Sequence, residues 1–299
     1  MLLPSKRCKI GIGTVQFGLD YGVANANGQT PEGEVRAILA RGAEAGCLTI
    51  DTASAYGEAE VVLGRFLWKD APFRIVTKTA PVNGTPIGAA VVAAFRESFL
   101  SSLRKLKRPA VYGLLAHHAS DLLAPGGDRL YDVLRKFRDV GLVERIGASV
   151  YDRTQIDALV DAYDLDLVQL PVNVLDQRLL ADGTLDRLHG RGIEIHARST
   201  FLQGLLLMPL DRVPAYFAPI MALLRDWHDQ AARQGMSLVE AALAFVRDLP
   251  QVDAVIIGVD SANQFEQVLH AASTAKAFDA AALACNDPAF VNPGQWGLS

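Results

Sequence analysis

The sequence predicts an α/β protein, a (β/α)8 TIM barrel in which residues 1–299 form a single domain. Short apolar runs alternate with amphipathic stretches from end to end, and no Ser/Gly-rich linker or charge block divides them. The apolar runs are continuous, as in VDAVIIGV at 252–259, which is typical of parallel strands covered by helices on both faces. Eight strand and helix units fit this barrel better than a doubly wound sheet, which usually has fewer strands.

Eight segments match the pattern of buried strands: residues 10–15, 48–50, 73–76, 111–116, 143–149, 165–170, 193–197 and 252–257. Amphipathic stretches with apolar residues three and four positions apart lie between them. We expect helices from residue 31 onward and over 60–68, 92–106, 130–140, 155–162, 184–189, 219–234 and 263–272. The alternation therefore repeats along the whole chain.

The first helix has clear end signals. Thr30 is expected to cap it and Pro31 suits its first position, while Glu32 and Glu34 favour the positive end of the helix dipole. Gly46 should end it. In the same way, Gly141 should stop the helix over 130–140.

Composition excludes several classes of function. The chain has 29 basic and 33 acidic residues, a net charge of −4, so it lacks the basic surplus that nucleic-acid binding needs. No apolar run is long enough for a signal peptide or a membrane span. We expect a cytoplasmic protein that binds neither nucleic acid nor membrane, and the sequence indicates no particular oligomeric state.

The cysteines and histidines indicate no metal site. Cys8, Cys47 and Cys285 are scattered without metal-ligand spacing, as expected for inert thiols in a reducing compartment. His117 and His118 are neighbours on an extended segment, so their side chains should point to opposite faces and not share one ion.

Four polar residues follow or close predicted strands. Asp51 closes the second strand, Lys78 the third and His117 the fourth, and Tyr56 lies in the loop after Asp51. Each has a structural alternative: a cap for Asp51, a packed aromatic for Tyr56, and solvated strand ends for the other two. Because barrel active sites lie where the strands end, three such residues on successive strands favour a catalytic site.

The chain resembles the aldo-keto reductase superfamily over nearly its whole length. The motifs that carry the resemblance are GTVQFG at 13–18, DTASAYG at 51–57, Thr77-Lys78, LLAH at 114–117, IGAS at 146–149, VQLPVN at 168–173, ARS at 197–199 and Ile257-Gly258. The resemblance implies a barrel without a Rossmann domain, a short N-terminal β-hairpin across the barrel floor and a C-terminal tail. It also implies a nicotinamide cofactor over the C-terminal rim. The run GIGTVQ at 11–16 agrees, since Gln16 replaces the third glycine of the GxGxxG fingerprint and we expect no helix to begin there.

By this resemblance Tyr56 is the general acid that protonates the substrate carbonyl, and the base in the reverse direction. A phenol has a pKa near 10, so a nearby cation is needed to stabilise its anion, and Lys78 suits that role. Asp51 would hold the Lys78 ammonium, and His117 would orient the carbonyl oxygen.

The resemblance also implies a row of cofactor contacts. Gly13, Thr14 and Asp51 belong to this site. From the nicotinamide to the adenosine, the others are Ser149 and Gln169 at the carboxamide, Arg198 and Ser199 under the nicotinamide and ribose, Phe201, Leu202, Gln203 and Gly204 along the diphosphate, and Gly258, Ser261 and Gln264 near the adenosine.

The chain departs from many relatives in this row. Val150 stands where they carry asparagine, and Arg198 stands where an aromatic residue is common under the nicotinamide, although a guanidinium can also stack. Residues 258–275 contain no Lys or Arg to bind a 2′-phosphate and do contain Asp260, while Val268 replaces an adenine-binding asparagine. The resemblance implies NADP(H), and these departures leave NAD(H) open.

Three functions follow from these observations. The first is an NAD(P)(H)-dependent oxidoreductase that reduces an aldehyde or ketone, or oxidises a sugar-like hydroxyl. The second is a barrel hydrolase or lyase that uses Asp51 and His117 without a redox cofactor. The third is a non-catalytic nucleotide-sensing or partner-binding barrel. Loops at 119–127, 202–216 and 286–299 should select the small-molecule substrate, with Phe290 and Trp296 either covering the pocket or packing on the barrel.

Overall fold

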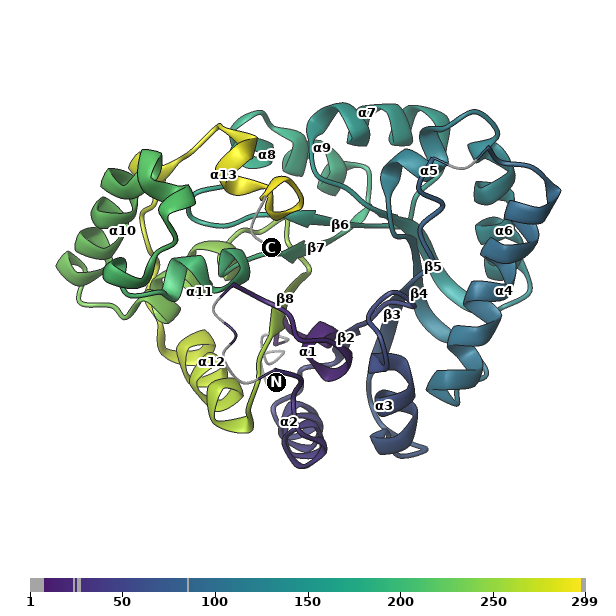
Figure 1. Cartoon of the computed structure of the whole chain (residues 1–299), viewed down its shortest axis with the longest axis horizontal. Coiled ribbons are helices and arrows are strands. Elements are labelled where there is room, and N and C mark those ends of the chain that lie inside the picture. The colour runs from purple at the N-terminus through teal and green to yellow at the C-terminus, as the bar shows by residue number, and fades with distance from the viewer. Residues whose placement is uncertain (1–7, 24, 26–27, 85, 297–299) are drawn as a thin grey trace, which may run out of the picture.

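The computed structural model describes residues 8–23, 25, 28–84 and 86–296 (Figure 1). Eight parallel strands pair in chain order, and β8 closes the barrel against β1. They are β1 (Ile10–Gly13), β2 (Thr49–Asp51), β3 (Arg74–Lys78), β4 (Val111–Ala116), β5 (Val143–Ser149), β6 (Leu167–Pro171), β7 (Glu194–Arg198) and β8 (Ala254–Gly258). The predicted (β/α)8 fold is therefore confirmed, and the bounds of β4 and β5 match the prediction.

The first strand is shorter than predicted because the chain leaves it at Thr14. The Thr14 N–H and hydroxyl both donate to the Asp51 carbonyl, at 3.0 and 2.9 Å. A single helical turn, α1 (Val15–Gly18), follows, and it buries Phe17. The expectation that no helix begins after Gly13 is therefore wrong.

Helices surround the strands (Figure 1). After α1 they are α2 (Glu32–Glu44), α3 (Ala59–Phe66), α4 (Ala89–Leu106), α5 (Ala119–Leu123), α6 (Gly127–Asp139), α7 (Arg153–Ala162), α8 (Arg178–Ala181), α9 (Thr184–Gly190), α10 (Met221–Arg233), α11 (Leu238–Arg247), α12 (Ala262–Thr274) and α13 (Pro288–Val291). Gly46, with φ of +71°, follows the end of α2 as predicted. Thr30 does not cap α2, however: the helix begins at Glu32 with Pro31 at the N-cap, and the Thr30 hydroxyl has no partner among the described residues.

The sequence periodicity does not predict one full helix, α11. It begins with a capping box, in which the Ser237 hydroxyl accepts from the Glu240 N–H and the Glu240 carboxylate accepts from the Ser237 N–H. This Ser-x-x-Glu pattern is visible in the sequence and could have marked the helix start. The helix predicted from residue 219 begins instead at Met221, after a 3₁₀ segment that contains Pro219.

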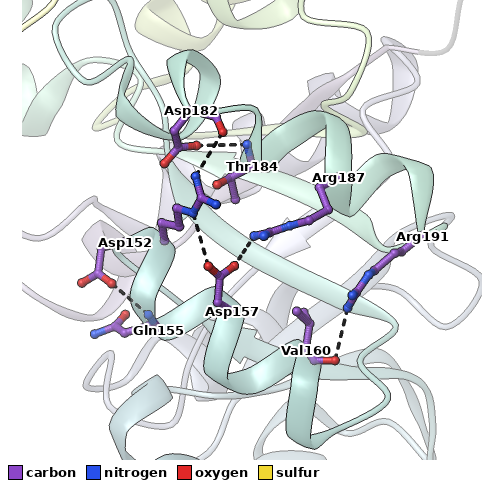
Figure 2. Close-up of polar contacts among 9 residues, drawn as sticks. Asp152, Gln155, Asp157, Val160, Asp182, Thr184, Arg187 and Arg191 are labelled. Carbon is purple, nitrogen blue, oxygen red and sulfur yellow. Dashed lines mark hydrogen bonds and ion pairs between the residues drawn. The ribbon is translucent and has the colours of Figure 1, made fainter.

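Ion pairs join neighbouring helices on the outside of the barrel. Figure 2 shows Asp157 of α7 facing Arg187 of α9, and Arg153 also donates to Asp157, at 3.2 Å. At the start of α7 the Asp152 carboxylate accepts from the Gln155 N–H at 2.9 Å. These contacts fix the segment that follows β5, whose end lies in the cavity described below.

The sequence predicts a hairpin at the N-terminal end of the chain and a tail at the C-terminal end. The predicted N-terminal hairpin would precede β1, where residues 1–7 lie outside the described residues. The C-terminal tail packs beside the 3₁₀ segment Ala215–Ile220: Tyr216 donates its hydroxyl to the Ala289 carbonyl at 2.8 Å, and the rings of Phe217 and Trp296 meet edge to face.

Two cysteines that are far apart in the sequence meet at the start of β1 and β2. The Cys8 and Cys47 sulfur atoms lie 3.0 Å apart. The hydrogen bond with Cys47 lowers the pKa of the Cys8 thiol to about 7.

Among the described residues, no helix is long and apolar enough to cross a membrane.

Candidate active site

A cavity of about 830 Å³ lies where the barrel strands end. Each of the eight strands places a residue in its lining. Seven of these lie at the strand's last position or just beyond it, and Gln169 lies two positions before the end of β6: Gly13, Asp51, Lys78, His117, Ser149, Gln169, Arg198 and Gly258. Parallel strands bring their carboxyl ends to one rim, so residues up to 245 positions apart share this cavity. Its volume is within the range of small-molecule sites.

A buried ion pair lies at the centre of the cavity. Lys78 Nζ lies 2.6 Å from Asp51 Oδ1, and the two side chains are 1% and 6% exposed. Lys78 also donates to the Thr52 carbonyl at 3.1 Å, and Gln169 donates its side-chain amide to the same Asp51 oxygen at 2.7 Å. Burial lowers the pKa of Lys78, but the Asp51 carboxylate and Tyr56 outweigh it and the pKa is raised. Lys78 is therefore a fixed cation.

Tyr56 lies beside this ion pair. Lys78 Nζ donates to the Tyr56 hydroxyl oxygen at 3.3 Å and lies 4.9 Å from the ring centroid. The loop is held by a close backbone approach, since a Cβ on Gly18 would lie 2.0 Å from the Tyr56 carbonyl oxygen. Burial raises the pKa of Tyr56 more than the Lys78 charge lowers it. The phenol is therefore protonated and can donate a proton.

His117 closes the group on the β4 side. Its ring meets the Tyr56 ring edge to face, with centroids 5.9 Å apart. Burial, with the charges of Lys78, His118 and Arg198, lowers the pKa of His117 to about 3, so the imidazole is neutral. Its Nδ1 has no hydrogen-bond partner among the described residues.

The His117 and His118 rings do not point to opposite faces, because their centroids lie 5.2 Å apart. The described part of the chain nevertheless contains no group of three His, Cys, Asp or Glu side chains that could hold a metal ion.

Most of the residues expected to hold a cofactor line the cavity. They are Gly13, Thr14, Asp51, Ser149, Gln169, Arg198, Ser199, Phe201, Gln203, Gly204, Gly258 and Gln264. Leu202 and Ser261 do not line it. Leu202 is fully buried in the apolar cluster beneath the loop, and Ser261 caps α12 by accepting from the Gln264 N–H at 3.2 Å.

Several lining residues could not be found from the sequence. Tyr151 comes from a loop and Arg212 from a 3₁₀ turn, both without a motif. Tyr21 also lines the cavity; it belongs to the opening GTVQFGLDYG at 13–22, which resembles a bacterial-like branch of the superfamily, and Gln203 donates to its hydroxyl at 3.0 Å. Phe290 and Trp296 are not in the lining and pack in the tail instead.

Two features of the cavity fit an extended polar ligand such as a dinucleotide. Oxygen atoms of Gln16 and Asp260 in the lining are buried without a hydrogen-bond partner among the described residues. Leu202, Gln203 and Gly204 all have left-handed backbone, with φ of 48°, 53° and 92°. Such strained runs cluster at ligand sites. The residues present therefore fit the implied cofactor.

Comparisons with known proteins agree with this geometry. The model of the "Aldo/keto reductase family" matches residues 9–283. A Pseudomonas aeruginosa structure described as an aldo-keto reductase is 22% identical, with a TM-score of 0.66 over 89% of this chain and 90% of that one. The holo form of aldo-keto reductase AKR11C1 from Bacillus halodurans is 19% identical, with a TM-score of 0.71 over 91% of this chain and 88% of that one.

At these identities the solved structures show a shared fold. None of the curated proteins compared with the chain matches it. The family model spans most of the chain, from before β1 to beyond α12. The chain therefore belongs to the aldo/keto reductase family and is an oxidoreductase of that kind.

Proposed function

We propose that the protein reduces an aldehyde or ketone with NAD(P)H, or oxidises a sugar-like hydroxyl in the reverse direction, with Tyr56 as general acid and base. The observation that carries the proposal is the contact between the Tyr56 hydroxyl and the buried Lys78 ammonium, beside a neutral His117. This arrangement pairs a proton donor with a charge that stabilises its anion.

The proton moves from the Tyr56 hydroxyl to the carbonyl oxygen of the substrate. The phenolate left behind faces the buried Lys78 Nζ at 3.3 Å, and this positive charge stabilises it. Asp51 and Gln169 keep this ammonium in place through the hydrogen bonds described above. The ion pair thus tunes the acid without itself transferring the proton.

His117 orients the substrate. A neutral imidazole carries one N–H that can donate to the carbonyl oxygen, and an imidazole with a pKa of about 3 does not compete as the acid. The ring's edge contact with Tyr56 brings this donor to the same side of the cavity as the phenol. In this proposal Tyr56 and His117 would both donate to the carbonyl oxygen and polarise it.

The nicotinamide cofactor, when bound, supplies or accepts the hydride. Ser149 and Gln169 would hold its carboxamide; Gln169 Nε2 donates to Asp51, which leaves the amide oxygen to accept from the carboxamide N–H. The segment from Phe201 to Gly204 would run along the diphosphate, and Gly258 and Gln264 would face the adenosine.

The adenosine end supports weak discrimination between NADPH and NADH. Asp260 lines it with a buried oxygen that could accept from a ribose hydroxyl but would repel a 2′-phosphate. Burial raises the pKa of Asp260, and the charge of Asp20 adds to this. Arg212, an exposed residue of the cavity lining that comes from another loop, could supply a cation for a 2′-phosphate. We expect both cofactors to be used.

The test is a cofactor-dependent assay of the purified chain. Oxidation of NADPH and NADH is followed by absorbance with a panel of aldehydes and ketones, and cofactor binding is measured by calorimetry. Carbonyl-dependent oxidation of either cofactor supports the proposal. Binding without turnover of any carbonyl would favour a nucleotide-sensing barrel, and hydrolysis or elimination without cofactor would favour the hydrolase or lyase.

A further inference from the structure

Arg198 brings a cation into the cavity that no carboxylate balances. It lines the cavity and forms no ion pair with any described residue. Arg178, by contrast, donates to both oxygens of Asp176, at 2.7 and 2.9 Å. Since Lys78 is paired with Asp51, Arg198 leaves the catalytic end of the cavity with a net positive charge.

The guanidinium is held in one position. Its carbon lies 4.2 Å from the centroid of the Tyr151 ring, and its two terminal nitrogens donate to the Val150 carbonyl at 3.2 Å and the Ser199 hydroxyl at 3.3 Å. Ser199 itself has left-handed backbone, with φ of 60°. An arginine has five N–H donors, so three of them have no acceptor among the described residues. These donors are available to a ligand.

The guanidinium lies at the catalytic end of the cavity, near His117 and among the residues that the resemblance places at the nicotinamide. Arg198 ends β7, but its contacts with Val150 and Tyr151 carry its head past β6 to the end of β5. β4 pairs with β5 with Ala116 opposite Ala148, so His117 lies next to this point. The lining residues expected along the diphosphate and adenosine follow β7 and β8, on the other side of Arg198.

We infer that Arg198 binds an anionic group of the substrate, and that the preferred substrates are carbonyl compounds bearing a carboxylate close to the reacting carbon, such as 2-oxo acids. This inference rests on the proposed function and adds a substrate class to it. A planar fork with free N–H donors matches a carboxylate geometrically, which a lysine would not do. Partial burial of the guanidinium and the absence of an internal acid partner strengthen the attraction.

The test compares two substrates with the same reacting ketone and different charge, phenylglyoxylate and methyl phenylglyoxylate, in the unmodified chain and in Arg198→Gln. A charge-assisted hydrogen bond of ordinary strength corresponds to about a ten- to hundredfold change. Arg198→Gln should therefore lower kcat/KM for the acid by about that factor more than it lowers kcat/KM for the ester, and any effect on cofactor binding is common to both substrates. The intrinsic reactivity of each ketone cancels in the ratio between the two proteins.

Two further variants sharpen the result. Arg198→Lys keeps the charge without the planar fork, so it should recover part of the preference for the acid. Arg233→Gln removes an exposed arginine at the end of α10, outside the cavity lining, and should leave the ratio unchanged. Equal losses for acid and ester, together with weaker NADPH binding, would overturn the inference and assign Arg198 to the cofactor.

The substrate class can be tested separately from turnover. If the unmodified chain reduces the ester but shows no dependence on Arg198 for the acid, the proposed function stands and the inference fails. If it reduces neither ketone, calorimetry of phenylglyoxylate with the NADP⁺-saturated protein decides: binding lost in Arg198→Gln supports the inference, and no binding by the unmodified chain overturns it.

Discussion

Replacing Lys78 with methionine tests the ion pair at the centre of the site. Lys78→Met removes an ammonium that lies 2.6 Å from Asp51 Oδ1 and 3.3 Å from the Tyr56 hydroxyl. Without its nearest cation the phenolate is less stable, so the pKa of Tyr56 should rise above that in the unmodified chain. The alkaline limb of the pH profile for alcohol oxidation should therefore move upward, and the rate should fall.

Lys78→Met should also lower the free energy of unfolding, because Lys78 and Asp51 are buried. Asp51 would be left as a nearly buried carboxylate whose remaining side-chain donor is Gln169. Removing one member of a buried ion pair costs about 3–5 kcal/mol, because the other charge is left uncompensated. Lys78→Met should lose about that much free energy of unfolding, and adding Asp51→Asn should recover much of it.

The assay combines the pH dependence of alcohol oxidation with urea unfolding of the three proteins. The oxidation profile is interpreted only under conditions where each variant is folded by circular dichroism. A lower rate with an unmoved alkaline limb would mean that Lys78 positions the cofactor or substrate instead of tuning Tyr56. If Lys78→Met were as stable as the unmodified chain, this would refute the argument that its loss leaves the buried Asp51 carboxylate uncompensated.

Three further predictions concern titration and cofactor choice. Because the pKa of His117 is about 3, the pH profile of kcat/KM for reduction should show no inflection near the ordinary imidazole pKa of about 6.5. An inflection there that disappears in His117→Gln would contradict a neutral imidazole. Burial raises the pKa of Glu60, which accepts from Thr77 at 2.7 Å, so folding disfavours its charged form. This penalty on the folded state is absent below the ordinary carboxyl pKa and grows as pH rises. The free energy of unfolding of Glu60→Gln, relative to that of the unmodified chain, should therefore increase from acid to neutral pH. A decrease of this difference in urea unfolding over the same pH range would contradict the prediction. Asp260→Arg should tighten NADPH by about tenfold or more and leave NADH nearly unchanged in calorimetry; a thousandfold NADPH preference in the unmodified chain would reveal a phosphate clamp elsewhere.

The barrel could be predicted because its evidence is local and repeated. Strands buried on both faces are continuous apolar runs, so β4 and β5 match their predicted bounds. The one-turn helix α1 was missed because four residues contain too few positions for a period to show. Thr30 failed as a cap because the choice between two neighbouring start positions depends on backbone geometry that the sequence pattern does not specify.

Part of the candidate site could likewise be predicted from the sequence, and part of it could not. The sequence predicts that Asp51, Lys78 and His117 lie together, because parallel strands end at one rim of the barrel. It also predicts that Tyr56 joins them, because Tyr56 lies in the loop that follows Asp51. Contacts between distant loops left no signal along the chain. The Arg198 contact with Tyr151, the Gln203 bond to Tyr21 and the meeting of two cysteines all depend on the folded shape.

The most direct test of the proton transfer by Tyr56 is the activity of Tyr56→Phe with its cofactor bound. The change removes only the hydroxyl and keeps the ring that meets His117 and Lys78, so NADPH affinity should stay nearly unchanged. We predict that kcat/KM for carbonyl reduction falls by at least about 10²- to 10⁴-fold, the contribution of a positioned general acid. Near-normal turnover by Tyr56→Phe would contradict the assignment of Tyr56 as the acid.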